Sequence, residues 1–193
     1  MDYREYKKAS ERHLDTCLSL KRIIEDTYEG RTLNPTKEFE KQEHLFNLYY
    51  LSGYIIECRI NYSILEFINF NIIATRNRLN SCKQLKSFHS ANPYKVSFSS
   101  RYDNNANYYL WRPQHKFQTN IDFFAVDSKL SGIDHIRGLN GNRITPISVN
   151  QLFQDWDVEY RYETKNQTLI SSEIFDFLDF ANEVLTGLEN LGY

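Results

Sequence analysis

Residues 45–68 read LFNLYYLSGYIIECRINYSILEFI, and this apolar run is the most informative part of the chain. Its Leu, Ile, Phe and Tyr residues recur on most sides of a helix and leave no continuous polar face. A helix that is apolar all round is buried all round. We therefore expect residues 37–73, which begin with a polar segment, to form the central helix of a bundle.

The flanking sequence predicts helices on both sides of this run. Residues 2–29 have amphipathic helical periodicity, and Gly30 is a suitable C-cap. Ser171 and Ser172 are expected to cap the last helix, with Glu173 favourably placed in its first turn.

Three shorter helices are expected between the central and last helices, at 114–127, at 132–139 and from Val149 to Glu163. Residues 76–113 differ, because they are rich in polar and aromatic residues. Within them two Val-, Phe- and Tyr-containing segments flank a turn signal at 103–105 and suit a short β-hairpin. We predict one all-α domain, residues 1–193: an antiparallel helical bundle with an insertion at about 76–113.

Composition excludes several classes of protein. The 193 residues are 41% hydrophobic and 25% charged, which is typical of a globular protein. The longest apolar run without a charged residue is shorter than the ~18 residues of a membrane span, and the charged start lacks the apolar core of a signal peptide. We therefore expect a cytoplasmic protein. The three widely spaced cysteines match neither a zinc site nor a redox dithiol, and no cofactor or metal motif is found.

The net charge of −2 is distributed unevenly. Residues 72–150 carry +7 and residues 151–193 carry −7. The basic segment could bind a polyanion such as RNA. It could equally face the acidic segment of the same chain or of a second copy. Since the chain is also 15% aromatic, more than a small bundle buries easily, we predict a homodimer.

Three residues are candidates for a polar centre: Glu57, His115 and Arg161. Gly53 costs ~1 kcal/mol inside a helix, so another element or a ligand should approach closely there. Glu57, one turn later, must find a partner or stay protonated. Arg161 suits either that pairing or phosphate binding. His115 suits either acid–base chemistry or a helix start.

The insertion contains candidate nucleic-acid-binding residues, because aromatic and basic side chains alternate there. Bases stack on aromatic rings while Lys and Arg contact phosphates. A loop packed on itself or exchanged between two copies is the alternative. The candidates are Lys95, Arg101, Tyr109, Trp111 and Arg112.

The segment from Gly53 to Cys58, GYIIEC, resembles the GYxxEC signature of one branch of the HEPN (higher eukaryotes and prokaryotes nucleotide-binding) domains. The helix start at His115 and the segment from Trp156 to Tyr162 are similar to two later motifs of that branch. This order is kept across about residues 40–190, apart from the longer insertion. The resemblance implies a helical, usually dimeric protein that works on RNA or nucleotides, often in prokaryotic defence, stress or toxin–antitoxin modules.

The chain departs from the HEPN pattern at the motif that the family's ribonucleases use for catalysis. HEPN ribonucleases carry an Arg followed, after four to six residues, by a His, and none of the five histidines here is preceded in that way. We therefore expect an RNA- or nucleotide-binding subunit, with a cognate partner protein from the same operon. A ribonuclease with a non-standard site and a non-catalytic interaction subunit remain open as alternatives.

Overall fold

The computed structural model describes residues 4–67, 135–139, 143–157 and 168–193. These residues form four α-helices and no strand. The helices are α1 (Arg4–Thr27), α2 (Pro35–Phe67), α5 (Ile147–Asp155) and α6 (Ser171–Asn190). The all-α prediction is confirmed for this part of the chain.

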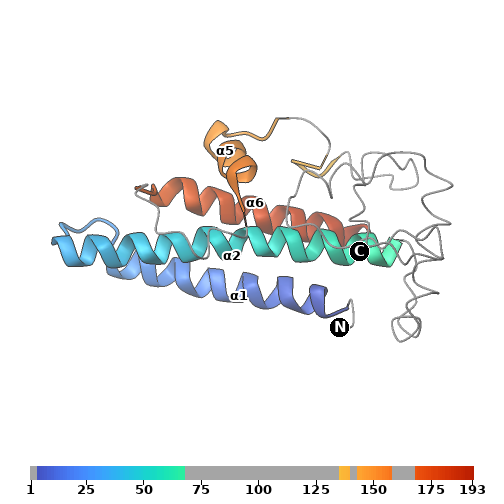
Figure 1. Ribbon diagram of the computed structural model, residues 1–193, viewed down its shortest axis with the longest axis horizontal. Helices are drawn as coiled ribbons and strands as arrows, with labels where there is room; N and C mark the ends of the chain where they lie inside the picture. The colour runs from blue at the N-terminus through green and yellow to red at the C-terminus, as the bar shows by residue number, and fades with distance from the viewer. Residues whose placement is uncertain (1–3, 68–134, 140–142, 158–167) are drawn as a thin grey trace, which may run out of the picture.

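The turn between α1 and α2 follows from its local sequence. Helix α1 ends at Thr27, two residues before the predicted end. Gly30 follows in the turn with a φ of +69°, which glycine adopts without steric cost. Asn34 Oδ1 accepts the main-chain N–H of Lys37 at 2.9 Å, and Pro35 takes the first helical position. Together they start α2, so that α1 and α2 run antiparallel (Figure 1).

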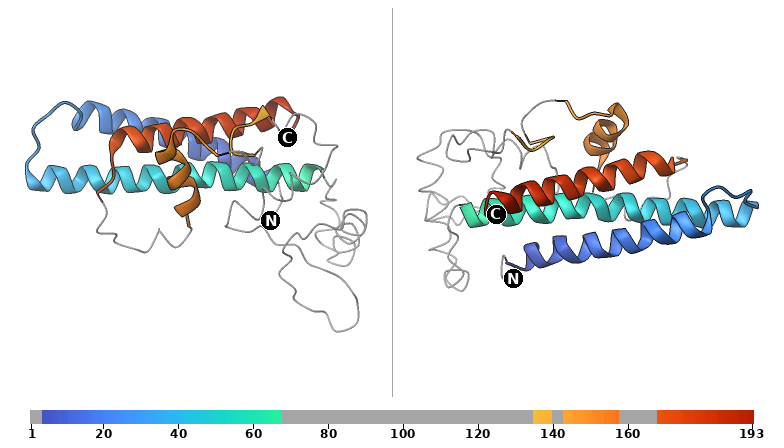
Figure 2. Two further views of the ribbon diagram at one scale, coloured as in Figure 1. Left: turned by 90° about the horizontal axis from the view of Figure 1, so that it is seen from above. Right: turned by 180° about the vertical axis from the view of Figure 1, so that it is seen from behind.

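Helix α2 lies between α1 and α6, as Figures 1 and 2 show. Residues 55–61 are all buried, which confirms the prediction of a central helix. The predicted apolar stripe of α6 is buried from Ile174 to Leu188, while Leu191, just past the helix end, is half-buried. The core therefore lies along both sides of α2.

The direction of α6 differs from the prediction, because α6 runs parallel to α2. Near the start of both helices, the Gln42 side chain donates to the carbonyl oxygen of Leu169 at 3.2 Å and accepts its N–H at 2.8 Å. Near the end of both helices, Arg59 pairs with Glu189. The antiparallel arrangement thus holds for α1 against α2 and α6, but not for α2 and α6. Long crossover connections permit such parallel neighbours, and residues 68–170 separate these two helices.

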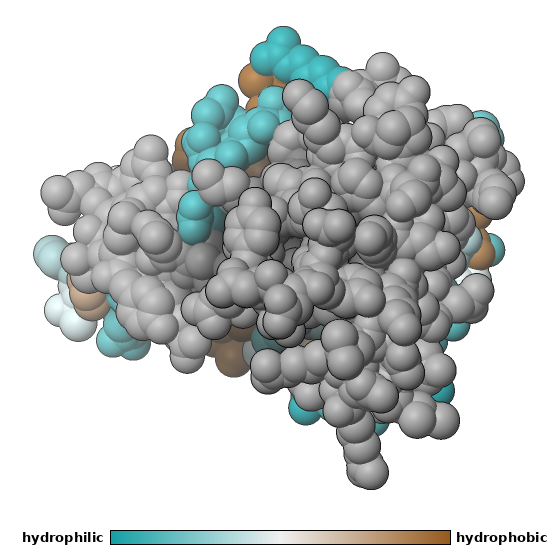
Figure 3. Space-filling model, turned by 45° about the vertical axis from the view of Figure 1, so that its right-hand side comes forward, coloured by the Kyte–Doolittle hydropathy of each residue, from teal (hydrophilic) through white to brown (hydrophobic). Residues whose placement is uncertain are grey.

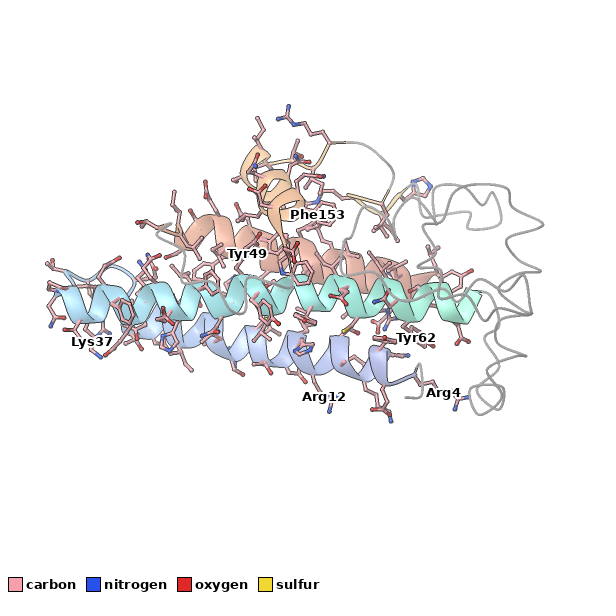
Figure 4. All side chains as sticks on the ribbon, in the orientation of Figure 1. Arg4, Arg12, Lys37, Tyr49, Tyr62 and Phe153 are labelled. Carbon is pink, nitrogen blue, oxygen red and sulfur yellow. The ribbon has the colours of Figure 1, made fainter. Side chains whose placement is uncertain are left out.

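Helix α5 lies over α2 and α6, where Figure 4 labels Tyr49 and Phe153. The Tyr49 hydroxyl donates to the carbonyl oxygen of Leu152 at 2.6 Å. Phe153 meets Phe180 of α6 edge to face, with ring centroids 5.5 Å apart. The helix ends at Asp155, before the predicted end, because Trp156 is extended with φ −65° and ψ 128°.

Two local predictions are wrong. Of the helix predicted at 132–139, residues 135–139 are described, and they form a turn. Gly138 has a φ of +82° there, and the Leu139 N–H bonds to the carbonyl oxygen of Ile136 at 3.1 Å. Ser171 does not cap α6, since Ile170 holds the cap position without a side-chain hydrogen bond. The Ser171 side chain bonds to Glu29.

The predicted insertion at 76–113, its hairpin and the helix at 114–127 lie outside the described residues. None of the described helices combines enough length with enough apolar character to cross a lipid bilayer.

Candidate functional site

The close approach predicted at Gly53 is made by the side chain of Trp156. A Cβ atom placed on Gly53 would lie 1.9 Å from Nε1 and 2.1 Å from Cε2 of Trp156, far inside the ~3.5–4.0 Å of normal contact. The indole N–H donates to the carbonyl oxygen of Tyr50 at 3.2 Å, and Trp156 is 4% exposed. Glycine at position 53 therefore allows the indole to rest on the backbone of α2.

Two tyrosines of α2 surround this indole. The ring centroids of Tyr54 and Trp156 are 5.4 Å apart, those of Tyr50 and Trp156 are 6.4 Å apart, and those of Tyr50 and Tyr54 are 4.8 Å apart. The side chains of Tyr50 and Tyr54 also share a hydrogen bond. Both tyrosines are half-buried, so parts of their rings remain open to a ligand.

Glu57 lies one helical turn beyond Gly53 and is 4% exposed. Burial raises the pKa of Tyr6, Tyr54 and Cys58, and the negative charge of Glu57 raises each of these pKa values further. The carboxylate therefore lies among three groups that hold a proton. Together with one histidine of α1, these residues line the contact between α1 and α2, and we call them the seam cluster: Tyr6, His13, Tyr54, Glu57 and Cys58.

The pKa shifts decide which chemistry the seam cluster can perform. Burial, followed by the charge of Glu57, raises the pKa of Cys58 to about 12. Because the thiolate is the nucleophile, Cys58 is inert at neutral pH, and Tyr54 likewise keeps its proton. The cluster is thus equipped to form hydrogen bonds rather than to attack a substrate through sulfur or phenolate.

His13 and Tyr6 are the members of the seam cluster that no sequence motif indicated, and His13 is the one that contacts Tyr54. Its ring centroid lies 5.7 Å from that of Tyr54, and burial, followed by the neighbouring charge of Arg12, lowers its pKa. The available signal was its spacing of seven residues from Tyr6, which puts both side chains on one face of α1. What sequence alone could not supply is the alignment of that face with Tyr54.

Helix α2 carries a second buried charge, Arg59, which sequence reasoning also missed. Arg59 is 1% exposed, and its Nη1 lies 3.2 Å from Glu189 Oε1. Its Nη2 donates to the main-chain oxygen of Tyr193, and burial lowers its pKa. This pair fastens the end of α2 to the end of α6, which is a structural role. A single Arg within a buried apolar run was the signal that could have found it.

The structure describes only part of the predicted site. Glu57 lies near Tyr54, one helical turn beyond the contact between Gly53 and Trp156. The other predicted residues lie outside the described ranges, so the pairing of Glu57 with Arg161 stays a prediction. These residues are His115, Arg161, Lys95, Arg101, Tyr109, Trp111 and Arg112.

Among the described side chains, no group of three or more His, Cys, Asp or Glu residues could hold a metal ion. A large exposed hydrophobic patch would indicate a docking surface. On the side of the molecule seen in Figure 3, hydrophobic patches are small among the described residues, and hydrophilic side chains cover much of their visible surface. Comparison with protein-family models, curated proteins and solved structures finds no match.

Proposed function

We propose that this protein is a HEPN-like RNA- or nucleotide-binding subunit of a prokaryotic defence or toxin–antitoxin module. The observation that carries the proposal is the contact between Gly53 and Trp156. These two residues are 103 positions apart in the chain and belong to two of the motifs that resemble the HEPN branch. Their direct packing is what a shared structural centre requires.

The seam cluster and its neighbouring rings support a binding role. Tyr50, Tyr54 and His13 are half-buried rings with polar atoms, and such rings can stack on a base while they form hydrogen bonds. Cys58, with its raised pKa, supplies no nucleophile. Recognition is therefore better supported than covalent chemistry.

The proposed assembly is a cytoplasmic homodimer that acts with a cognate partner protein. Its support is the contrast between the basic segment at 72–150 and the acidic segment at 151–193, because oppositely charged surfaces favour association. Sedimentation equilibrium tests the dimer. We expect twice the chain mass of 23.0 kDa at micromolar concentration, and a monomer there contradicts it.

The binding role is tested with a short single-stranded RNA and fluorescence anisotropy between about 50 and about 200 mM salt. We expect affinity to fall with salt, and the triple variant Lys95→Ala, Arg101→Ala, Arg112→Ala to reduce the salt slope by about 2. The matched control changes three exposed basic residues outside the basic segment, Arg22, Arg31 and Lys37, to Ala and should bind like the wild type. If the wild type binds no RNA or nucleotide at low salt, the interaction-subunit alternative takes its place.

A ribonuclease with a non-standard site is the second candidate, and His13 is the observation that favours it. A neutral imidazole beside Tyr54 could accept a proton from a reacting hydroxyl group. The test is incubation of labelled RNA with the protein in EDTA. The wild type should cleave the RNA and His13→Gln should not. His135→Gln, which changes an exposed histidine, should cleave like the wild type. Intact RNA in the wild-type sample contradicts this candidate and leaves the binding role.

A further inference from the structure

The imidazole of His13 is half-buried on the side of α1 that faces Tyr54 of α2. Its described contact is with the ring of Tyr54, at 5.7 Å between centroids. Neither ring nitrogen makes a hydrogen bond to a described residue. Imidazole nitrogens that lose part of their water on folding normally gain a partner. The geometry of His13 therefore suits a ligand that supplies one.

A second open group lies two helical turns earlier on the same face of α1. The hydroxyl of Tyr6 makes no hydrogen bond to a described residue, although the residue is half-buried. His13 thus presents a hydrogen-bonding group beside the half-buried ring of Tyr54, which in turn contacts Tyr50. Tyr6 presents a second group two turns away, near Glu57 and Cys58. Such a combination of donors and rings can bind a molecule with one polar and one aromatic part.

We propose that His13 donates a hydrogen bond to a phosphate oxygen of bound RNA or nucleotide, with a base of the same ligand against the rings of Tyr50 and Tyr54. This inference rests on the proposed function and names the contact that α1 makes with the ligand. It places part of the binding site on the described helices, independently of the predicted residues at 95–112.

The charges around His13 determine how binding depends on pH. On α1, Arg12 disfavours the protonated imidazole, and burial acts in the same direction. On α2, Tyr54 carries no charge at neutral pH, and the charge of Glu57 near Tyr54 does not offset the lowering of the His13 pKa. The free protein therefore holds His13 largely neutral at pH 7, with one N–H to donate. A phosphate favours the imidazolium ion, so ligand binding takes up a proton.

The experiment measures affinity for a short single-stranded RNA and for AMP from about pH 8 to about pH 5, by anisotropy and calorimetry. For each unit by which the ligand raises the pKa of His13, wild-type affinity should rise about tenfold over this range. His13→Gln should remove that rise, and the matched variant His135→Gln should keep it. Binding of RNA but not AMP assigns the contact to the polymer, and binding of both assigns it to a nucleotide unit.

Imidazole NMR signals separate the outcomes. In the supported outcome, the His13 ring signals shift with ligand and report a higher pKa in the complex, while circular dichroism shows that His13→Gln is folded. Salt-dependent RNA binding with the same pH profile in wild type and His13→Gln overturns this inference and leaves the proposed function standing. No binding by the wild type at any pH overturns both.

Discussion

Substituting Gly53 by alanine tests whether the contact with Trp156 organises the centre of the molecule. In an exposed helix this change is favourable by ~1 kcal/mol, because alanine is the better helix former. Here the new methyl group would lie 1.9 Å from Nε1 and 2.4 Å from Cδ1 of Trp156. The indole is a rigid, buried ring, so it must be displaced for the methyl group to fit.

The size of the effect follows from the burial of the indole. Adding a methyl group to a packed core costs ~1–3 kcal/mol. Complete loss of about 200 Å² of buried indole surface costs ~5 kcal/mol, and loss of the hydrogen bond to Tyr50 adds ~1 kcal/mol. A separation of 1.9 Å calls for the upper end of the methyl cost, ~3 kcal/mol, as the lower limit. After the helix-propensity gain of ~1 kcal/mol is subtracted, we expect Gly53→Ala to lower the free energy of unfolding by about 2–5 kcal/mol.

The assay is urea unfolding of four proteins: wild type, Gly53→Ala, Trp156→Ala and the double variant. Trp156→Ala alone should cost ~3–5 kcal/mol. In that background the methyl group meets empty space, so Gly53→Ala should now stabilise by up to ~1 kcal/mol. The sign of one substitution thus depends on the other residue. Equal effects of Gly53→Ala in both backgrounds would refute the reasoning.

Three further predictions concern buried or titrating groups. Burial raises the pKa of Cys17 and of Cys58 to about 12. In a Cys82→Ser variant, these two thiols should therefore resist a thiol reagent at pH ~8 until the protein is unfolded; rapid labelling of the native protein contradicts this. Glu189→Gln should destabilise by ~1–3 kcal/mol because it leaves Arg59 buried without its anionic partner, whereas Arg59→Met should cost less; unfolding in urea measures the order, and the reverse order counts against a structural pair. His13 has a lowered pKa, so the unfolded chain binds protons more readily, and the wild type should lose stability relative to His13→Gln as pH falls through about 6.5; parallel stability curves for the two proteins are the contrary result.

The helices were predictable because the signals that define them are local. Periodicity located α1 and α6, Gly30 marked the end of α1, and the continuous apolar character of α2 placed it in the centre. The direction of α6 relative to α2 was not predictable. Antiparallel neighbours are expected for helices joined by short loops, whereas residues 68–170 separate these two helices. The pairing of Gln42 with Leu169 depends on packing that no local pattern encodes.

In the candidate site too, residues with a local signal could be predicted and residues placed by tertiary packing could not. Gly53 could be singled out from sequence because glycine in a buried helix needs a reason, and the reason is Trp156. His13 could not be assigned to the site, because periodicity shows which face of α1 is buried but not which residue of α2 lies opposite. That register depends on the length of the turn and on the packing of Cys17 and Ile24, which are fully buried.

Helix α2 carries two buried charged residues, Glu57 and Arg59. Replacing a buried ion pair by apolar residues is often neutral or stabilising, so a buried charge indicates a requirement other than stability. Arg59 has a structural explanation in Glu189. Glu57 has a different setting: its charge acts on Tyr6, Tyr54 and Cys58, all of which hold a proton. Burial is the larger cause of these raised pKa values and the charge of Glu57 adds to it. Glu57 is therefore the acceptor in a group of proton-bearing side chains at the α1–α2 contact, whereas Arg59 pairs with an anion of α6.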